Sequence, residues 1–365
     1  MHFIVSKTEL SQLVSKIQNI VPQKPMIPIL SNILVEAKAN ELIITATDLT
    51  VGVRFFIPAK VLEEGSTTLP GRRFFQLIRE LTSANLEIIT NNNEVSEILA
   101  HSSRFKLNGM NKKDYPALPD LTGAINFDID TTLFKEMISR TTFAVARDDS
   151  RYTLNGVLFE ISGGELSVVT TDGKRLAKMS TSITLDPTFA RQYILPLKAV
   201  EEIGGMLSDS ATSTVYLMDD KVAVESNQGL IITKLLAGDY PDYRRVIPQN
   251  PTLSISLHRE ELMTLLRQVA LFTTETSCSV KFSFTSGELK LLANHAEIGE
   301  GKVSMAANYQ GNPLDIAFSP VFFLDILRHC KDETINLSLT DAFNPVLITD
   351  SSSALFVIMP MRLIS

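Results

Sequence analysis

The sequence lacks the features that mark a disulfide-stapled, metal-binding or membrane-spanning protein. Its two cysteines, Cys278 and Cys330, are too few for a disulfide framework and do not have the spacing of metal ligands. The longest apolar runs, such as residues 355–359, have the length of a strand and are far shorter than a membrane span. The first three residues begin no secretion signal. We therefore expect a cytoplasmic protein with reduced thiols, no bound metal and no membrane contact.

Groups that could carry catalysis are scarce and scattered. None of the five histidines shows the spacing of a paired carboxylate or nucleophile. The pair Gly173 and Lys174 is no phosphate-binding loop, because the earlier glycine and the following serine or threonine are missing. Asp48 and Asp172 lie near basic residues, which leaves an enzyme as the alternative interpretation, but their equivalent repeat positions favour a shared turn. We therefore expect a non-enzyme without catalytic residues or a cofactor.

What the sequence does contain is one structural unit, repeated three times. At 365 residues the chain is too long for one ordinary core, so two or three domains are expected. The motif Asp-Tyr-Pro at 114–116 returns at 239–241, an offset of 125 residues. Each copy opens with a short strand and an amphipathic helix, which are expected at 3–5 and 8–21, at 127–129 and 131–145, and at 255–257 and 259–272.

Each copy continues with a hairpin and a second helix. Alternating apolar residues around turn residues predict hairpins at 30–44, 151–179 and 280–292. Proline near the first helical position predicts second helices at 71–81, 197–207 and 321–330. We therefore predict an α+β fold of three tandem domains, each with two helices on an antiparallel sheet. The expected domains are 1–124, 125–251 and 252–365.

The charges are distributed unevenly between the helices and the rest of the chain. The net charge is −7, so the surface as a whole should repel nucleic acid. Six helical windows nevertheless carry +5 together, whereas the remainder carries −12. Threefold repetition should bring these helices to one side of the molecule, and a basic face on an acidic body is typical of a protein that holds a duplex by its phosphates. The absence of a recognition-helix motif, zinc finger or aromatic platform favours binding without sequence preference.

Four short motifs resemble those of the bacterial DNA sliding clamp, the β subunit of DNA polymerase III. They are RYTLNG at 151–156, TDGKRLA at 171–177, YPDYRRV at 240–246 and MPMRL at 359–363. The resemblance covers essentially the whole chain and implies a head-to-tail homodimer, closed into a ring around double-stranded DNA, that acts as a processivity factor in DNA replication. The partners it implies are the replicative polymerase alpha subunit, an ATP-driven clamp-loader complex and other proteins with a clamp-binding motif.

The resemblance also implies a dimer interface and a peptide-binding pocket. The interface positions are Phe105 and Leu107 on one side and Leu271 and Phe272 on the other. The pocket would lie between the second and third domains, as an apolar cleft with a cationic rim and an adaptable methionine surface. Its matching positions are Leu154, Thr171, Gly173, Lys174, Arg175, Leu176, Pro241, Arg245, Val246, Val357, Met359, Pro360, Met361 and Arg362.

The DNA-contacting positions of the family carry over less cleanly. Lys24 keeps the charge of an arginine, and Tyr152 and Lys198 match. Arginines in or beside the predicted helices are further candidates, namely Arg72, Arg73, Arg79, Arg140, Arg147 and Arg267. Asp148 stands where a neutral amide is known in the family, and we leave it out because its carboxylate would repel phosphate.

Three positions depart from the family pattern in the peptide pocket and leave its peptide preference open. Lys174 stands where histidine is common, and Phe343 and Pro345 stand where smaller residues are usual. A second alternative interpretation also remains, in which the repeats form a scaffold that binds peptides but never DNA. The basic helices are the feature that discriminates against that scaffold.

Overall fold

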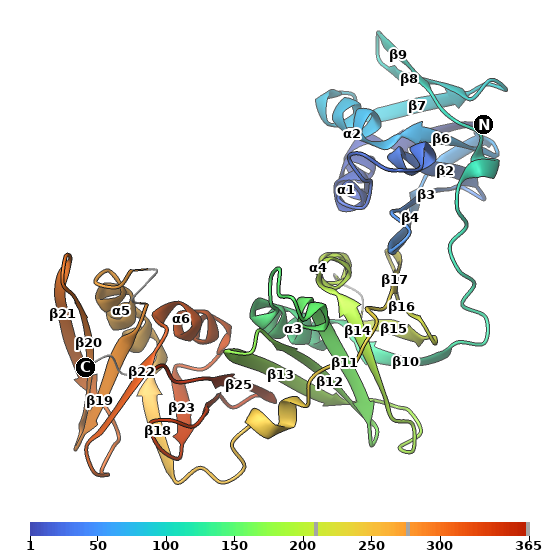
Figure 1. Ribbon diagram of the computed structural model, residues 1–365. Coiled ribbons are helices and arrows are strands. Elements are labelled where there is room, and N and C mark those ends of the chain that lie inside the picture. The colour runs from blue at the N-terminus through green and yellow to red at the C-terminus, as the bar shows by residue number, and fades with distance from the viewer. Residues whose placement is uncertain (208–210, 275–277, 363–365) are drawn as a thin grey trace. The chain divides into compact units, whose positions relative to one another are not determined.

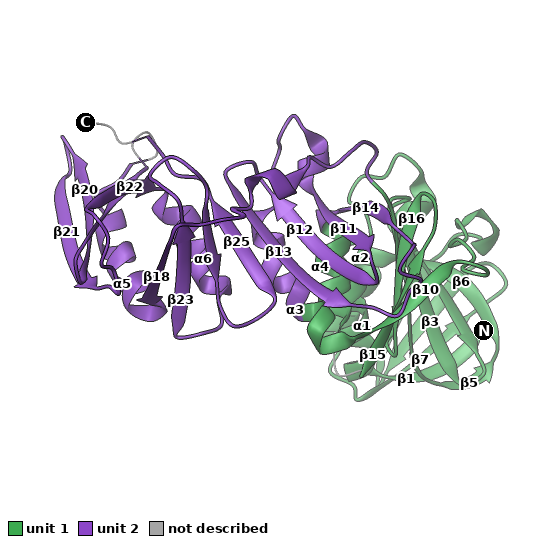
Figure 2. Ribbon diagram, turned by 90° about the horizontal axis from the view of Figure 1, so that it is seen from below, with its two compact units in different colours: residues 1–135, 198–235 green, residues 136–197, 236–365 purple. Residues whose placement is uncertain are grey.

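The computed structural model describes residues 1–207, 211–274 and 278–362, and it divides into two compact units (Figures 1 and 2). Unit 1 comprises residues 1–135 and 198–235, and unit 2 comprises residues 136–197 and 236–365. Each unit is built on two antiparallel sheets. The predicted α+β class is therefore confirmed.

Unit 1 contains a five-stranded and an eight-stranded sheet. In spatial order the first sheet consists of β5 (Lys60–Glu63), β1 (His2–Ser6), β7 (Asn85–Thr90), β8 (Val95–Ala100) and β9 (Ser103–Asn108). The second consists of β10 (Ile125–Asp130), β15 (Thr212–Leu217), β16 (Lys221–Ser226), β17 (Gly229–Lys234), β4 (Val51–Pro58), β3 (Glu41–Thr47), β2 (Asn32–Lys38) and β6 (Gly65–Pro70).

Unit 2 contains an eight-stranded and a four-stranded sheet. The larger sheet consists of β14 (Arg191–Pro196), β11 (Gly156–Ser162), β12 (Glu165–Thr171), β13 (Arg175–Ser182), β25 (Ala354–Ile358), β24 (Val346–Thr349), β23 (Thr334–Leu339) and β18 (Leu253–His258). The smaller consists of β21 (Gly299–Ala306), β20 (Glu288–His295), β19 (Val280–Thr285) and β22 (Leu314–Phe318).

Helices lie in pairs beside these sheets. In unit 1, α1 (Lys7–Ile17) packs on α2 (Gly71–Glu80), and in unit 2, α5 (Arg259–Ala270) packs on α6 (Pro320–His329) (Figure 1). Two further helices of the described residues are α4 (Leu197–Met206) and α3 (Thr131–Thr141). The helix α3 begins in unit 1 and continues into unit 2. Each helix packs by a buried apolar stripe, as in α1, where Leu10, Leu13, Val14 and Ile17 are buried.

Two helices, α1 and α3, end four residues earlier than their apolar patterns predict. The helix α1 stops at Ile17 rather than Val21, because the amide of Ile20 turns back to the carbonyl of Ile17. Ile20 and Val21 are still buried, so the core continues through a turn that periodicity cannot distinguish from helix. The helix α3 stops at Thr141, where the chain enters a short 3₁₀ turn, Thr142–Ala144.

The predicted hairpins are confirmed, and their turn residues explain them. Ala39 and Asn40 connect β2 to β3 with φ of 49° and 66°, and Gly163 and Gly164 connect β11 to β12 with φ of 63° and 75°. Paired positive φ values at a two-residue turn match the right-handed twist of the strands. The third hairpin joins β19 to β20 through Gly287, at φ 77°.

The two large sheets explain why the middle repeat is divided between the units. In unit 1, β17 pairs with β4 and places Ile232 opposite Gly52. In unit 2, β25 pairs with β13 and places Val357 opposite Leu176. One part of the middle repeat thus continues a sheet of the first repeat, and the other part continues a sheet of the third repeat. The domain boundaries predicted near residues 124 and 251 stay a prediction.

No helix of the described residues is long and apolar enough to cross a membrane. Within residues 1–207, 211–274 and 278–362, no group of three or more histidine, cysteine, aspartate or glutamate side chains is placed to hold a metal ion.

Candidate functional site

The turn at residues 171–175 organises the candidate peptide pocket in unit 2. The hydroxyl of Thr171 accepts from the amide of Gly173 at 3.0 Å and donates to the carbonyl of Arg175 at 2.6 Å. One carboxylate oxygen of Asp172 accepts from the amides of Lys174 and Arg175, both at 2.9 Å. Gly173 has φ +83°, a conformation that a side chain disfavours. Asp172 therefore acts as a turn residue, which agrees with the interpretation that the sequence favoured over catalysis.

A cavity of about 120 Å³ lies beside this turn. Leu154, Leu176 and Val357 each have about 1% of their surface exposed and form its apolar floor. Predicted pocket residues that line the cavity are Leu154, Thr171, Gly173, Lys174, Arg175, Leu176, Pro241, Val246, Val357 and Met359. The prediction missed Arg151, Asp242 and Tyr243, although all three lie within the motifs at 151–156 and 240–246 that it used.

The remaining predicted pocket residues lie outside the cavity wall, and they are Arg245, Pro360, Met361 and Arg362. The Arg245 side chain is 83% exposed and pairs with Asp242 at 2.9 Å. The C-terminal segment is held on both sides: the amide of Met359 donates to the carbonyl of Lys174 at 2.9 Å, and that of Met361 donates to the carbonyl of Ala317 at 2.7 Å. The last residue of the terminal motif, Leu363, lies outside the described residues.

The cations of the pocket differ in how available their charges are. Arg175 is only 10% exposed in its side chain, because it pairs with Asp172 at 3.1 Å and Asp325 at 2.7 Å. Its guanidinium also lies 4.6 Å from the centre of the Phe322 ring, so it braces the wall. Lys174 is exposed and makes no ion pair with any carboxylate among the described residues. Lys174 is therefore the rim cation available to a ligand.

Arg151 is the third cation of the rim. Its guanidinium donates hydrogen bonds to both carboxylate oxygens of Asp149, the shorter at 2.8 Å. These hydrogen bonds lower the pKa of the Asp149 carboxyl to about 2. The same guanidinium lies close to Gly173, since a β-carbon at that position would be 3.2 Å from it. Arg151 thus packs over the turn as well as lining the cavity.

Most of the predicted DNA-contacting residues are exposed. On α2, Arg72, Arg73 and Arg79 lie opposite the buried Phe74 and Ile78. The other exposed candidates are Lys24, Arg147, Tyr152, Lys198 and Arg267. The ammonium of Lys198 donates to Asp48 at 2.7 Å, so a phosphate would have to compete with that carboxylate.

Arg140 corrects the predicted DNA-contacting set, because its side chain is 5% exposed. Its guanidinium pairs with the fully buried carboxylate of Asp350 at 2.5 Å and donates to Ser352 at 2.6 Å. It also donates to the backbone carbonyl of His329 at 2.8 Å. The prediction that Arg140 contacts DNA is therefore wrong, because the end of α3 packs on the turn at 350–352 instead of facing solvent.

The predicted interface residues lie on or beside free sheet edges. Phe105, 38% exposed, lies with Leu107 on β9, which is the last strand of its sheet. Leu271, 74% exposed, follows α5, whereas the Phe272 ring packs on β21, another edge strand. A β-carbon at Gly301 of β21 would lie 2.4 Å from that ring.

Comparison with known families gives three consecutive matches along the chain. The matched models are described as the DNA polymerase III beta subunit N-terminal domain over residues 1–119, central domain over 128–242 and C-terminal domain over 244–362. The chain is 54% identical over 363 residues to the "Beta sliding clamp" of Chlamydia muridarum (strain MoPn / Nigg), covering 100% of this chain and 99% of that protein. It is 32% identical over 368 residues to the "Beta sliding clamp" of Proteus mirabilis, covering 100% of both.

Solved structures of similar proteins extend the likeness to three dimensions. The DNA polymerase sliding clamp from Bacillus subtilis has a TM-score of 0.94 at 27% identity, with 100% of both chains covered. A sliding clamp from Pseudomonas aeruginosa, solved bound to griselimycin, has a TM-score of 0.95 at 28% identity, again with 100% of both chains covered.

Proposed function

This chain belongs to the DNA polymerase III beta subunit family, and we propose that it works as a sliding clamp that encircles duplex DNA and tethers a polymerase to it. The observation that carries this proposal is the tandem match of all three family domains across residues 1–362. The protein supplies no catalysis in this proposal: it raises the processivity of an enzyme that it holds on the template. Asp172, one of the two aspartates behind the alternative enzyme interpretation, is consistent with that, since its carboxylate accepts hydrogen bonds from backbone amides of its own turn.

The proposed ring is a head-to-tail dimer in which β9 of one protomer meets β21 of the next. Both are edge strands, and an unpaired edge is a template for pairing with another chain. A heterologous contact of this kind either closes into a ring or grows without limit. Phe105 and Leu271 supply exposed apolar surface beside the two edges, which favours their burial in such a contact.

DNA contact is proposed for the exposed cations of the helices and neighbouring loops. Lys24, Arg73 and Arg267 are exposed. Arg73 on α2 and Arg267 on α5 lie on the side of the helix away from its buried apolar stripe. Phosphate contacts of this kind position a duplex without reading its bases, and each loses affinity as salt rises. The proposed grip is therefore independent of sequence and sensitive to salt.

Partner binding is proposed for the cavity beside the turn at 171–175. Its floor of Leu154, Leu176 and Val357 suits an apolar side chain, and the exposed Lys174 suits a carboxylate. We propose that a short segment of the replicative polymerase alpha subunit, the clamp-loader complex or another clamp-binding protein occupies it. Met359 adds a flexible thioether to the wall, which allows related segments to pack.

Sedimentation of the Leu271→Glu variant tests the ring. Placing a carboxylate in an apolar contact should convert the dimer into a monomer, because an unpaired buried charge is costly. Val321→Glu is the matched control, since Val321 is also exposed, at 54%, on α6 of the same unit. A wild-type monomer at working concentration, or a Leu271→Glu dimer as stable as the wild type, would contradict the proposed interface.

A further inference from the structure

Unit 1 contains a second copy of the turn that organises the peptide pocket. The hydroxyl of Thr47 accepts from the amide of Leu49 and donates to the carbonyl of Val51, both at 3.0 Å. One carboxylate oxygen of Asp48 accepts from the amides of Thr50 and Val51 at 2.9 and 2.7 Å. These are the same four hydrogen bonds that the turn at 171–175 makes.

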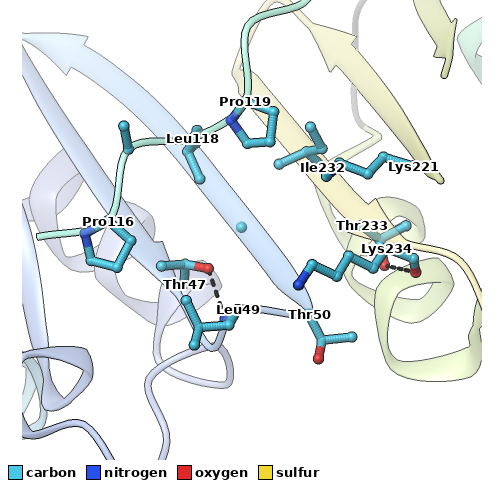
Figure 3. Close-up of a pocket in the computed structure, with 12 residues that line it drawn as sticks. Thr47, Leu49, Thr50, Pro116, Leu118, Pro119, Lys221, Ile232, Thr233 and Lys234 are labelled. Carbon is cyan, nitrogen blue, oxygen red and sulfur yellow. Dashed lines mark hydrogen bonds between the residues drawn. The ribbon is translucent and has the colours of Figure 1, made fainter. Parts of the chain in front are cut away.

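A cavity of about 150 Å³ lies beside this second turn (Figure 3). Its wall is built as in unit 2: β17 pairs with β4 as β25 pairs with β13, and Pro116 follows Tyr115 as Pro241 follows Tyr240. Gly52 takes the place of Leu176, which leaves room for the Leu118 side chain, since a β-carbon at position 52 would lie 2.4 Å from it. Unit 1 therefore has a cavity at the position equivalent to the unit 2 pocket, with different residues in its floor.

Leu49 indicates that this cavity has a function of its own and is not only a by-product of the repeated structure. It has φ +73°, in the left-handed region where its counterpart Gly173 has φ +83°. A leucine there strains the backbone in a way that glycine would not. Leu49 is also 43% exposed and lines the cavity. Apolar surface that is held in a strained conformation beside a cavity points to a ligand that covers it.

Lys234 gives the same cavity a cationic group. Lys234 is exposed at the end of β17, and Figure 3 shows its ammonium directed toward the turn at Leu49 and Thr50. Lys221 lies on the neighbouring strand and pairs with Asp220, which is itself 68% exposed, at 2.7 Å. The cavity thus offers apolar contacts from Leu49, Leu118 and Ile232 beside positive charge.

We propose that this cavity is a second docking site, which takes an extended segment of a partner protein carrying a leucine-type side chain next to a carboxylate. The apolar side chain lies against Leu49 and Ile232, and the carboxylate meets Lys234. Each protomer then offers two peptide sites of related construction, one in each unit. This site goes beyond the proposed function, which uses only the pocket of unit 2, and either one can fail without the other.

Photo-crosslinking to the full-length protein tests this site. The probe is the peptide acetyl-Glu-photoleucine-Asp-Leu-amide, and mass spectrometry of the digested protein locates the label. We expect label on residues 49–52 or 116–119, in addition to any label near Leu154 or Val357. Label confined to the unit 2 pocket would overturn the inference and leave the proposed function standing.

Three variants and one further peptide sharpen the test. Lys234→Glu should lower labelling of the unit 1 site at least about fivefold, which corresponds to about 1 kcal/mol, whereas Lys38→Glu, on an exposed lysine at the end of β2, should leave it unchanged. Leu49→Gly should lower labelling without lowering the melting temperature, because the turn conformation suits glycine. The neutral peptide acetyl-Gln-photoleucine-Asn-Leu-amide should label the unit 1 site of the wild-type protein only weakly. The expected level is that of the acidic peptide on the Lys234→Glu variant. Labelling that is unaffected by Lys234→Glu and Leu49→Gly would overturn the proposed site.

Discussion

Arg73 and Arg140 occupy similar positions in the sequence, each on the polar side of a predicted amphipathic helix. Arg73 is exposed on α2, but Arg140 is buried against Asp350. The carboxylate that pairs with Arg140 lies 210 residues away along the chain, so no helical pattern could have revealed this ion pair. Exposure of a single cation depends on long-range packing, whereas the buried stripe of a helix can be predicted from its own period.

Replacing Arg140 should therefore affect stability rather than DNA binding. Arg140→Ala leaves the carboxylate of Asp350 buried without its cation, which typically costs about 3–5 kcal/mol. Arg73→Ala removes only an exposed side chain and should change stability by less than about 0.5 kcal/mol. Urea denaturation of both variants measures the difference. Equal midpoints for the two variants would contradict the structural role of Arg140.

His329 should make the stability of the protein depend on pH. Burial lowers the pKa of its imidazole, which stacks on Phe143 with ring centres 4.2 Å apart, and this outweighs the hydrogen bond to the Asp325 carbonyl. Because the unfolded chain takes up this proton at a higher pH than the folded chain, stability should fall as pH drops from about 6.5 toward the lowered pKa. Below that pKa this contribution should be constant.

The variant His329→Gln isolates this effect, since glutamine does not titrate in the same range. Urea midpoints measured from pH 7.5 to pH 5 should fall less steeply for His329→Gln than for the wild type. Parallel pH profiles for the two proteins would show that His329 keeps an ordinary pKa in the folded state.

Elements held by hydrogen bonds between residues close together in the sequence could be predicted. Elements held by hydrogen bonds between residues far apart in the sequence could not. The hairpin turns at Ala39–Asn40 and Gly163–Gly164 lie where the turn residues predicted them. The C-terminal segment is different, because Met359 bonds to Lys174 and Met361 to Ala317. Its place beside the pocket came only from the resemblance to a known family, and the burial of α3 at 350–352 was not predicted at all.

Deletion of residues 359–365 tests the part that this segment plays. The change removes Met359 from the cavity wall and both backbone hydrogen bonds that hold the segment. We expect a polymerase-derived peptide to lose detectable binding in a fluorescence anisotropy titration. The dimer should remain, because the proposed interface residues on β9 and beside β21 are untouched. An unchanged peptide affinity would move the binding site away from this cavity.

At the scale of the whole molecule, the proposed retention on DNA depends on charge and ring closure together. The chain is acidic overall, at −7, yet most of the helix cations predicted to meet DNA are exposed. An acidic protein that relied on these few phosphate contacts alone would be lost from DNA as salt rises. Closure of a ring removes that weakness, because a closed ring leaves the duplex only at a free end or by opening.

The most direct test of encirclement is retention on DNA of identical sequence before and after a single cut. The protein is loaded on a nicked circular plasmid by the proposed clamp-loader complex with ATP, freed of unbound protein by gel filtration, and treated with an enzyme that cuts the plasmid once. We predict that it stays with the intact circle through the column and is lost from the linear product within minutes. Equal retention on the circle and on the linear DNA would contradict the ring.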